Sequence, residues 1–223
     1  MHVLGIDAGG TKTVALLADG DGRYALNLAE GAVARVCVPV VGDHVACLGE
    51  NRKLKGAAYG NVALSRFPLK VVTNHDLSVE GYERRGALHT DVALTETEVL
   101  HVFNVHLGTA FLERRHQARR LSERQTGLLH NEELRGPKIV LGDFNEWMKG
   151  LTTELLSAKL NSVDLKQFLP RRRTYPGLFP LLHLDHIYYA GQMEILGVEL
   201  PRTRLALVAS DHLPLVADVR VGM

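Results

Sequence analysis

The sequence is divided into short runs rich in Val, Ile and Leu, and several runs end at a polar residue capable of chemistry. These runs are Val3–Ile6, Val62–Leu64, Val99–Val105, Lys138–Leu141, Leu182–Tyr189 and Leu205–Ala209. Runs of this length, bounded by Gly, Asn or Pro, predict buried β-strands. Because strand-end loops are where a rigid scaffold holds reactive groups, the polar residues after these runs are candidates for a functional site.

One long segment, from about Ala110 to Leu134, has the spacing of an amphipathic helix, and Gly136-Pro137 would end it. A shorter helix is expected over Leu151–Lys159. The apolar face of the long helix is predicted to consist of Phe111, Leu112, Ala118, Leu121, Leu128 and Leu129. Since strands outnumber helices and no regular βαβ repeat is present, the order of elements favours a sheet-rich α/β sandwich.

The size and composition of the chain fit one globular domain over residues 1–223. A chain of 223 residues can bury a sizeable core, and 46% apolar with 23% charged residues is ordinary for such a domain. Neither an internal repeat nor a Pro/Ser-rich linker divides it. The formal net charge of +1 gives no overall attraction to nucleic acid or anionic membranes, so polyanion binding would depend on local patches such as Arg171–Arg173.

The chain has two cysteines, Cys37 and Cys47. They could pair, but two cysteines in a chain of this size favour ordinary buried thiols over a disulfide framework, and they exclude a Cys-rich zinc cluster. The N-terminus has no basic region followed by an apolar stretch, and no apolar run has the length of a membrane span. We therefore expect a cytoplasmic protein without a transmembrane segment.

The strongest local motif is Gly142-Asp143-Phe144-Asn145, which follows a predicted buried strand. An extended backbone would place the side chains of Asp143 and Asn145 on one face. The carboxylate could then activate water or hold a cation, while the amide donates to a phosphoryl oxygen. An Asx-type turn, which Asp and Asn also favour, explains the same residues equally well.

Two further motifs each contain an Asp next to a His. Asp211-His212 offers a metal ligand and a group that can polarise water or bind phosphate, although a solvated surface turn also produces this pair. Asp185 lies inside an apolar run, where a carboxylate needs a partner. A buried carboxylate can fix the tautomer of a histidine, but spacing alone does not pair Asp185 with His212. His106 ends another run, and an isolated His there is more typical of a structural role.

Taken together, the motifs resemble the endonuclease/exonuclease/phosphatase superfamily. The segments that carry the resemblance lie between about Arg52 and Val221 and are, in order, YGNVALSRFP, ERRGAL, NVHLG, GDFNEW, LDHIYY and SDHLPLVADV. The resemblance implies a four-layered sandwich of two mostly antiparallel sheets flanked by helices, as in DNase I. It also implies hydrolysis of a phosphodiester or phosphomonoester with Mg²⁺ or Mn²⁺ at the sheet edges.

The resemblance further assigns roles to residues that match the family's motifs. Asp143 is expected to align or activate the attacking water, and Asn145 to steady the pentacovalent phosphate. His212 is expected to contact the scissile phosphate and to be oriented by Asp185. The other expected site residues are His106 on the phosphate or leaving-group side, Asp211 as a metal ligand, and Arg85 and Asn61 as supports for the phosphate.

The segment from Arg173 to Asp185 is similar to small bacterial members that lack the DNA-binding insertions of the nucleases. These members are suspected of acting on phospholipid or other small phosphodiesters. The basic face of the long helix could meet a polyanion, but charge on an exposed helix face usually serves solvation. Phospholipid-type, small phosphodiester and nucleic-acid substrates are therefore all compatible with the resemblance.

Residues 1–45 depart from the family pattern. Family members begin with a strand ending in an Asn-x-His motif, then a helix, then a strand ending in Gln-Glu, whose Glu is a principal metal ligand. Neither motif is present in this chain. The first 22 residues instead resemble the phosphate-binding hairpin of actin-like sugar kinases and related ATPases, in which a Gly-Gly-Thr turn binds phosphate through backbone amides.

Three explanations for this segment are compatible with the sequence. The first is a fusion or gene-boundary artefact on a truncated hydrolase, which would leave a catalytically impaired remnant or a binding domain. In the second, Val3–Asp7 and Tyr24–Leu28 replace the missing strands, and Asp7 and Glu30 complete a metal site with Asp211. The third, an ATP-binding kinase-like protein, is the weakest because the rest of that fold has no counterpart here.

Overall fold

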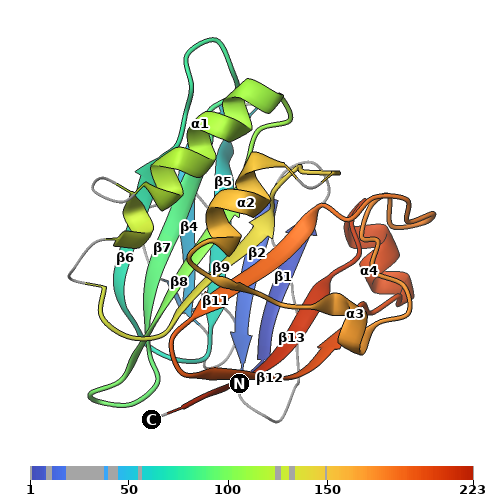
Figure 1. Ribbon diagram of the computed structural model, residues 1–223. Coiled ribbons are helices and arrows are strands. Elements are labelled where there is room, and N and C mark those ends of the chain that lie inside the picture. The colour runs from blue at the N-terminus through green and yellow to red at the C-terminus, as the bar shows by residue number, and fades with distance from the viewer. Residues whose placement is uncertain are drawn as a thin grey trace.

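The computed structural model describes residues 2–8, 12–18, 38–39, 45–54, 57–123, 127–130, 134–148 and 150–222 (Figure 1). The strands are β1 (His2–Ala8), β2 (Lys12–Ala18), β3 (Val38–Pro39), β4 (Val45–Leu54), β5 (Ala57–Ser65), β6 (Leu69–Asp76), β7 (Gly86–Ala93), β8 (Val99–His106), β9 (Lys138–Asp143), β10 (Asn161–Ser162), β11 (Asp185–Ala190), β12 (Met193–Glu199) and β13 (Leu215–Val221). The helices are α1 (Phe111–Ser122), the 3-10 turn η1 (Leu128–His130), α2 (Leu151–Ser157), α3 (Leu165–Phe168) and α4 (Arg204–Ala209).

The strands form two sheets, as the sequence predicts. The seven-stranded sheet has the order β12-β13-β1-β2-β5-β4-β3, and the six-stranded sheet has the order β10-β11-β9-β8-β7-β6. Each sheet contains one parallel pair, β2–β5 in the first and β8–β9 in the second, while the other named pairs are antiparallel. Both sheets are therefore mixed, with antiparallel pairing dominant.

Strand β8, in the middle of the six-stranded sheet, contributes apolar side chains to both faces of the sheet, since successive side chains of a strand point in opposite directions. On β8, Leu100 and Val102 join the core between the two sheets, where they meet Leu215 and Ala217 of β13. Phe103, by contrast, joins a second core that includes residues of α1 and α2. This central strand is thus buried on both sides, which explains why Val99–Val105 is apolar except at His101 and Asn104.

Helices α1 and α2 cover the outer face of the six-stranded sheet (Figure 1). The short helices α3 and α4 lie beside the β12–β13 side of the molecule. Within the described ranges, no long helix covers the outer face of the seven-stranded sheet, so three of the four expected layers are present there. No helix in these ranges combines the length and the apolarity that crossing a membrane would require.

The long helix predicted from Ala110 to Leu134 is shorter than expected, because α1 ends at Ser122. Its buried face also differs from the prediction. Phe111 and Leu112 are 59% and 66% exposed, and the buried residues of α1 are Glu113, Arg114, Gln117, Ala118, Leu121 and Ser122. Apolar spacing misassigned this face because its polar members are satisfied by local hydrogen bonds, which periodicity does not detect.

The strand predicted at Leu205–Ala209 is wrong, because these residues form α4. The side chain of Thr203 accepts a hydrogen bond of 3.1 Å from the backbone N–H of Ala206 and so caps the start of the helix. Leu and Ala are also strong helix formers, so the local preference agrees with the observed helix. The second predicted helix is confirmed as α2 over Leu151–Ser157.

The first two strands lie in the middle of the seven-stranded sheet. β1 pairs antiparallel with both β2 and β13, and β2 pairs parallel with β5. The strand predicted at Val3–Ile6 is therefore present as part of β1. Tyr24–Leu28, proposed above as a replacement strand, lies outside the described residues.

Cys47 on β4 is buried and disulfide-bonded. The expectation of an ordinary buried thiol is therefore wrong at this position. Disulfide formation requires the two Cα atoms to come within about 7 Å, and sequence spacing carries no information on that distance.

Candidate active site

Strand ends gather four of the predicted site residues at one edge of the sandwich. β8 ends at His106 and β9 at Asp143, and the two residues are register partners in the parallel pair. Asp143 is also the register partner of Asp185, where β11 begins. His212 lies just before β13, close to both carboxylates. The pairing of the strands thus joins motifs that are far apart in the sequence.

Asp143 is the centre of this cluster. Its Oδ2 lies 3.4 Å from Nε2 of His106 and 4.0 Å from Nε2 of His212. Its Oδ1 accepts a hydrogen bond of 2.8 Å from the backbone N–H of Asn145. This bond closes the Asx turn that the sequence allowed as an alternative, and it holds the carboxylate with Oδ2 toward the two imidazoles. The turn and the candidate site are therefore one feature.

Asn145 does not continue the extended strand that the sequence suggested. Its φ of 50° lies in the left-handed region, which Asn adopts more readily than most residues. Its Nδ2 donates a hydrogen bond of 2.8 Å to the carbonyl oxygen of Leu107. Because an amide nitrogen carries two hydrogens, one of them is left to interact with a ligand in the cavity.

His212 is held from several sides. Its Nδ1 lies 2.8 Å from Oδ2 of Asp185, and its backbone N–H donates a hydrogen bond of 2.9 Å to Oγ of Ser210. The ring of Tyr175 packs against the imidazole with a centroid distance of 4.8 Å. Since Asp185 accepts from Nδ1–H, Nε2 is the nitrogen that faces Asp143 and the cavity.

His106 is buried, and the loss of solvation lowers its pKa to about 3. The positive charges of Arg85, His212 and Arg52 contribute the smaller part of this lowering of the pKa. The imidazole therefore stays neutral at pH 7, although the Asp143 carboxylate lies nearby. The influence of the two guanidinium groups on His106 also places positive charge next to this cluster.

Polar residues of α1 hold the loop that follows His106. The backbone N–H of Gly108 donates a hydrogen bond of 2.8 Å to Oε1 of Gln117. Arg114 donates to the carbonyl oxygens of Gly108 and Thr109. A Cβ at Gly108 would lie 1.8 Å from the carboxylate carbon of Glu113, so a larger residue would displace the Glu113 side chain. The buried polar face of α1 thus has a defined task, namely to fix the chain beside the site.

A cavity of about 320 Å³ opens next to these residues. It is lined by Arg52, Tyr59, Glu83, Arg85, His106, Thr109, Asp143, Asn145, Trp147, Tyr175, Leu182, Leu184, Asp211 and His212. The lining combines carboxylates, two arginines, two histidines and an apolar side with Trp147 and the two leucines. A pocket of this composition suits an anionic group attached to a partly apolar body.

Glu83 organises the two arginines in the cavity wall. It forms an ion pair of 2.6 Å with Arg52 and one of 3.3 Å with Arg85. The guanidinium of Arg52 also lies over the ring of Tyr59, 4.4 Å from the centroid. Arg85 is buried, and its Nε makes no hydrogen bond within the described structure. The predicted site residue Arg85 therefore lies at the cavity with donor capacity for an anion.

Asn61, the other predicted phosphate support, is directed elsewhere. It is buried, and its Nδ2 donates to the carbonyl oxygens of Gly86 and Asn104 at 2.8 and 2.9 Å. Asn104 in turn donates to the carbonyl oxygen of Val62 at 2.9 Å. These bonds tie β5 of one sheet to β7 and β8 of the other. Asn61 therefore positions the strands that carry the site.

Of the three predicted metal ligands, the structure describes Asp211 and the backbone of Asp7. Asp211 is exposed and lines the cavity. β1 runs toward the end of β13 nearest His212, with Gly5 opposite Leu215, so the backbone of Asp7 comes to this edge. Glu30 lies outside the described residues. Within the described ranges, the cavity does not contain three carboxylate or imidazole ligand atoms within 4.8 Å of one another.

Sequence reasoning missed eight lining residues, namely Arg52, Tyr59, Glu83, Thr109, Trp147, Tyr175, Leu182 and Leu184. A signal existed for two of them, because Glu83 precedes the motif residue Arg85 and Trp147 follows Asn145 by two residues. The others join the site only through strand pairing and loop folding, which a single sequence does not display.

Comparison with known proteins gives a consistent picture. Residues 11–212 match the Endonuclease/Exonuclease/phosphatase family. The uncharacterized protein YbhP of Escherichia coli K12 is 35% identical over 176 residues, which cover 78% of this chain and 67% of YbhP. A UPF0294 protein of Vibrio vulnificus YJ016 is 31% identical over 138 residues, or 60% of this chain and 44% of that protein. The matched region begins well before Arg52, and none of these comparisons supports the kinase-like hairpin.

Solved structures share the fold at low sequence identity. A functionally unknown conserved protein from Enterococcus faecalis V583 has a TM-score of 0.64 at 20% identity, covering 80% of this chain and 77% of that chain. A mannosyl-6-phosphatase from Bacteroides thetaiotaomicron has 0.61 at 18%, covering 80% and 76%. The human Nocturnin catalytic domain with bound sulfate has 0.60 at 19%, covering 81% and 73%.

Proposed function

Because the chain belongs to the endonuclease/exonuclease/phosphatase family, we propose that it hydrolyses a phosphoester with the help of Mg²⁺ or Mn²⁺. The single observation that carries this proposal is the carboxylate of Asp143 between two imidazoles. Its Oδ2 lies 3.4 Å from His106 and 4.0 Å from His212, beside a cavity that also contains two arginines. This arrangement combines a base, proton carriers and cations for an anionic substrate.

Asp143 is the group that we expect to take a proton from the attacking water. Its Oδ1 is occupied by the Asn145 N–H, so Oδ2 is the oxygen that faces the cavity. A buried carboxylate within hydrogen-bonding reach of a water is a suitable general base, and a group in this role contributes about a hundredfold or more to the rate. The second hydrogen of Asn145 Nδ2 can donate to the phosphoryl oxygen as its charge grows.

His212 is the group that we expect to contact the phosphate. Asp185 fixes its tautomer through Nδ1, and the same carboxylate stabilises the imidazolium form when Nε2 carries a proton. Arg85 and Arg52 add positive charge to the wall of the same cavity. Such charges, fixed in place before the substrate arrives, stabilise the negative charge that develops on phosphoryl oxygens.

The oxygen donors at this edge fit a hard cation such as Mg²⁺, which often binds through one or two carboxylates together with water and substrate phosphate. Asp211 would hold the ion, and Asp7 and Glu30 are proposed as further ligands. The bound cation would supply charge neutralisation at the phosphoryl oxygens. Because the described residues provide few ligands for it, we expect weak binding in the absence of substrate.

The cavity lining favours a substrate in which an apolar group lies close to the phosphate. Trp147 is 62% exposed at the cavity, and Leu182 lies in the same wall. Covering an exposed aromatic ring with an apolar part of a ligand makes binding more favourable. This supports phospholipid-type or other small phosphodiesters over nucleic acid, whose backbone would call for a longer basic surface.

Hydrolysis of bis(p-nitrophenyl) phosphate by the full chain, with and without Mn²⁺ or Mg²⁺, tests the proposal. The wild type should release p-nitrophenol only with metal, and Asp143→Asn and His212→Asn should each lower kcat at least about a hundredfold. His116→Asn is the matched control, because His116 is exposed on α1 and should leave the rate unchanged.

Equal rates in the wild type and both site variants would contradict the proposal. Absence of metal-dependent turnover of the diester and of p-nitrophenyl phosphate would instead favour the impaired remnant or binding domain. A thermal shift with ATP that is lost in Thr11→Val would favour the kinase-like alternative.

A further inference from the structure

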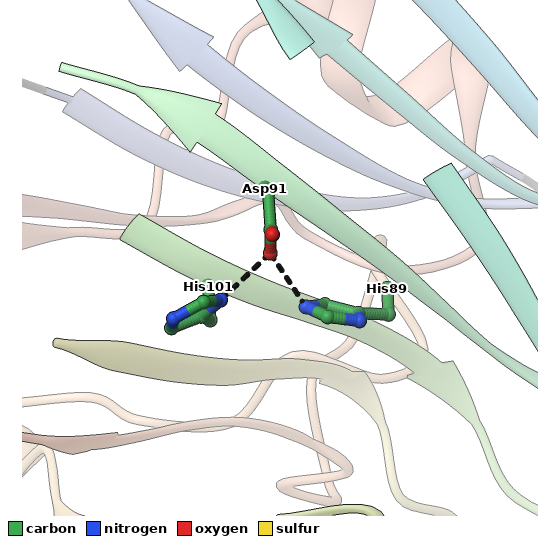
Figure 2. A group of neighbouring side chains, drawn as sticks. All are labelled: His89, Asp91 and His101. Carbon is green, nitrogen blue, oxygen red and sulfur yellow. Dashed lines mark hydrogen bonds and ion pairs between the residues drawn. The ribbon is translucent and has the colours of Figure 1, made fainter. Parts of the chain in front are cut away.

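Three side chains with metal-binding groups gather on β7 and β8, outside the candidate active site. His89 and Asp91 are two residues apart on β7, and Asp91 is the register partner of His101 on β8 (Figure 2). Alternate residues of a strand and cross-strand partners share a face of the sheet, so all three project to the same side. Their ligand atoms all lie within 4.8 Å of one another.

The cluster is separate from the catalytic cavity. His101 and His106 are five residues apart on the same strand, and a strand rises about 3.3 Å per residue, which puts them roughly 16 Å apart. None of His89, Asp91 and His101 lines the cavity described above. Whatever the cluster does, it does not form part of the proposed hydrolytic site.

The contacts of His101 place a nitrogen lone pair opposite a lone pair of the Asp91 carboxylate. Its Nε2 lies 3.1 Å from the carbonyl oxygen of Arg135, and its Nδ1 lies 2.7 Å from Oδ1 of Asp91. A carbonyl oxygen only accepts, so Nε2 must carry a hydrogen. A neutral imidazole then has a bare Nδ1, which would face the carboxylate with lone pair against lone pair. Either a second proton or a cation has to lie between the two atoms.

His89 brings a second nitrogen to the same carboxylate oxygen. Its Nε2 lies 2.8 Å from Oδ1 of Asp91, within ion-pair distance but not aligned as a hydrogen bond (Figure 2). The ring is 6% exposed and stacks on Phe103 at a centroid distance of 4.2 Å, which fixes its orientation. A buried nitrogen without a hydrogen bond is costly unless another partner satisfies it.

We propose that His89, Asp91 and His101 bind a divalent transition-metal ion of the zinc type. Two imidazole nitrogens and one carboxylate oxygen suit Zn²⁺ and its neighbours, whereas Mg²⁺ and Ca²⁺ prefer oxygen ligands only. The ion replaces the second proton between His101 and Asp91, and it satisfies Nε2 of His89. The bond from His101 Nε2–H to the Arg135 carbonyl is the outer contact that usually orients a metal-bound histidine.

Small movements are enough to admit the ion. With ligand bonds of about 2.0 to 2.1 Å in tetrahedral geometry, ligand atoms lie roughly 3.3 Å apart. The present separations of 2.7 and 2.8 Å therefore have to open by about half an ångström, which rotation of the Asp91 side chain can provide.

Calorimetric titration of the chelator-treated full chain with Zn²⁺, in a large excess of Mg²⁺, tests this site. The excess Mg²⁺ occupies oxygen-rich sites, so zinc binding that persists in its presence is assigned to the histidine cluster. We expect about one equivalent to bind to the wild type, and Asp91→Asn and His101→Gln to weaken it at least tenfold. His116→Gln at an exposed position and Asp211→Asn in the catalytic cavity should both retain zinc binding.

A measurement on the wild type alone guards against variants that fail to fold. In ¹⁵N spectra of histidine-labelled protein, Zn²⁺ should move the resonances of His101 Nδ1 and His89 Nε2 to metal-bound positions. The proposal is overturned if the wild type binds no zinc in excess Mg²⁺, or if folded Asp91→Asn binds it as tightly. It is equally overturned if His101 remains protonated on both nitrogens when zinc is present.

Discussion

Oδ2 of Asp185 lies 2.8 Å from Nδ1 of His212, and this contact determines which nitrogen of the imidazole faces the cavity. The two residues come from motifs 27 positions apart in the chain. Their pairing follows from the position of β11 next to β9 and of His212 just before β13. The contact makes Asp185 a positioning residue for the proposed reaction, acting through His212.

Replacing Asp185 with Asn should preserve the shape of the site but remove the charge that selects the His212 tautomer. We expect kcat for the aryl phosphodiester to fall by about tenfold to a hundredfold, as for other carboxylates that orient a functional histidine. The pH profile should shift as well, because the imidazolium form of His212 loses its partner. An unchanged pH profile with an unchanged rate would contradict this role.

Gly142 should not tolerate a side chain. Its φ is 135°, and a Cβ there would lie 1.9 Å from the carbonyl oxygen of Val105 on the neighbouring strand. Gly142→Ala is therefore expected to lower the free energy of unfolding by several kcal/mol, since it forces β8 and β9 apart next to Asp143.

Gly81 offers the matched control. It also has a positive φ, of 82°, but nothing lies within 4 Å of its Cβ position. Gly81→Ala should cost only about 1 kcal/mol, the penalty of a left-handed backbone. Chemical denaturation of both variants measures the difference, and equal losses would show that the strand contact at Gly142 is unimportant.

Gln117 on α1 should support both stability and activity. Gln117→Ala removes the acceptor of the Gly108 N–H, and a buried unsatisfied donor costs about 1 to 3 kcal/mol. Because His106 precedes Gly108 by two residues, kcat should fall as well. Gln167→Ala on α3 is the control, since Gln167 is exposed and its truncation should change neither the midpoint of thermal unfolding nor the rate.

Acid should destabilise the fold through His186. This residue is partly buried, and loss of solvation, followed by repulsion from His183, lowers its pKa to about 3. An unfolded histidine has a pKa near 6.5, so between pH 6.5 and 3 the unfolded state binds more protons. Stability contributed by the neutral ring is thus present above about pH 6.5 and is lost as the pH falls toward 3.

His186→Phe should remove this part of the acid sensitivity. The ring packs edge-on against Phe144 with a centroid distance of 5.5 Å, so an aromatic replacement keeps the contact. We expect the variant to be as stable as the wild type at pH 7 and more stable by a few kcal/mol, as an order of magnitude, near pH 4. Urea denaturation at both pH values measures this; a constant difference between the proteins would refute the assignment.

The parts of the fold and site that the sequence could predict are those determined by local pattern. The run Val99–Val105 and the run before Gly142 predicted strands that the structure confirms, and the Gly142–Asn145 motif pointed to two residues that line the cavity. Both signals lie in neighbouring residues. Leu205–Ala209 was misassigned because a short apolar run fits strand and helix alike, and the cap at Thr203 decides between them.

Other features are invisible to local pattern because they depend on pairing between distant segments. Asn61 looked like a phosphate ligand, yet its amide spans two sheets to reach carbonyls on β7 and β8. The cluster at Asp91 requires two strands in register, so neither half of it stands out alone. The polar residues on the buried face of α1 were likewise not predicted, because Gln117 and Arg114 have their partners in the preceding loop.

The antiparallel pairing of β1 with β13 has a consequence for how the chain acquires its structure. His2 is the register partner of Asp218, so a contact in the middle of a sheet joins residues more than two hundred positions apart. Contacts of such long range slow folding, because the chain has to close a large loop before any of them form. During synthesis, β1 keeps one unpaired edge until β13 has been made. For that interval this edge is exposed to pairing with other chains.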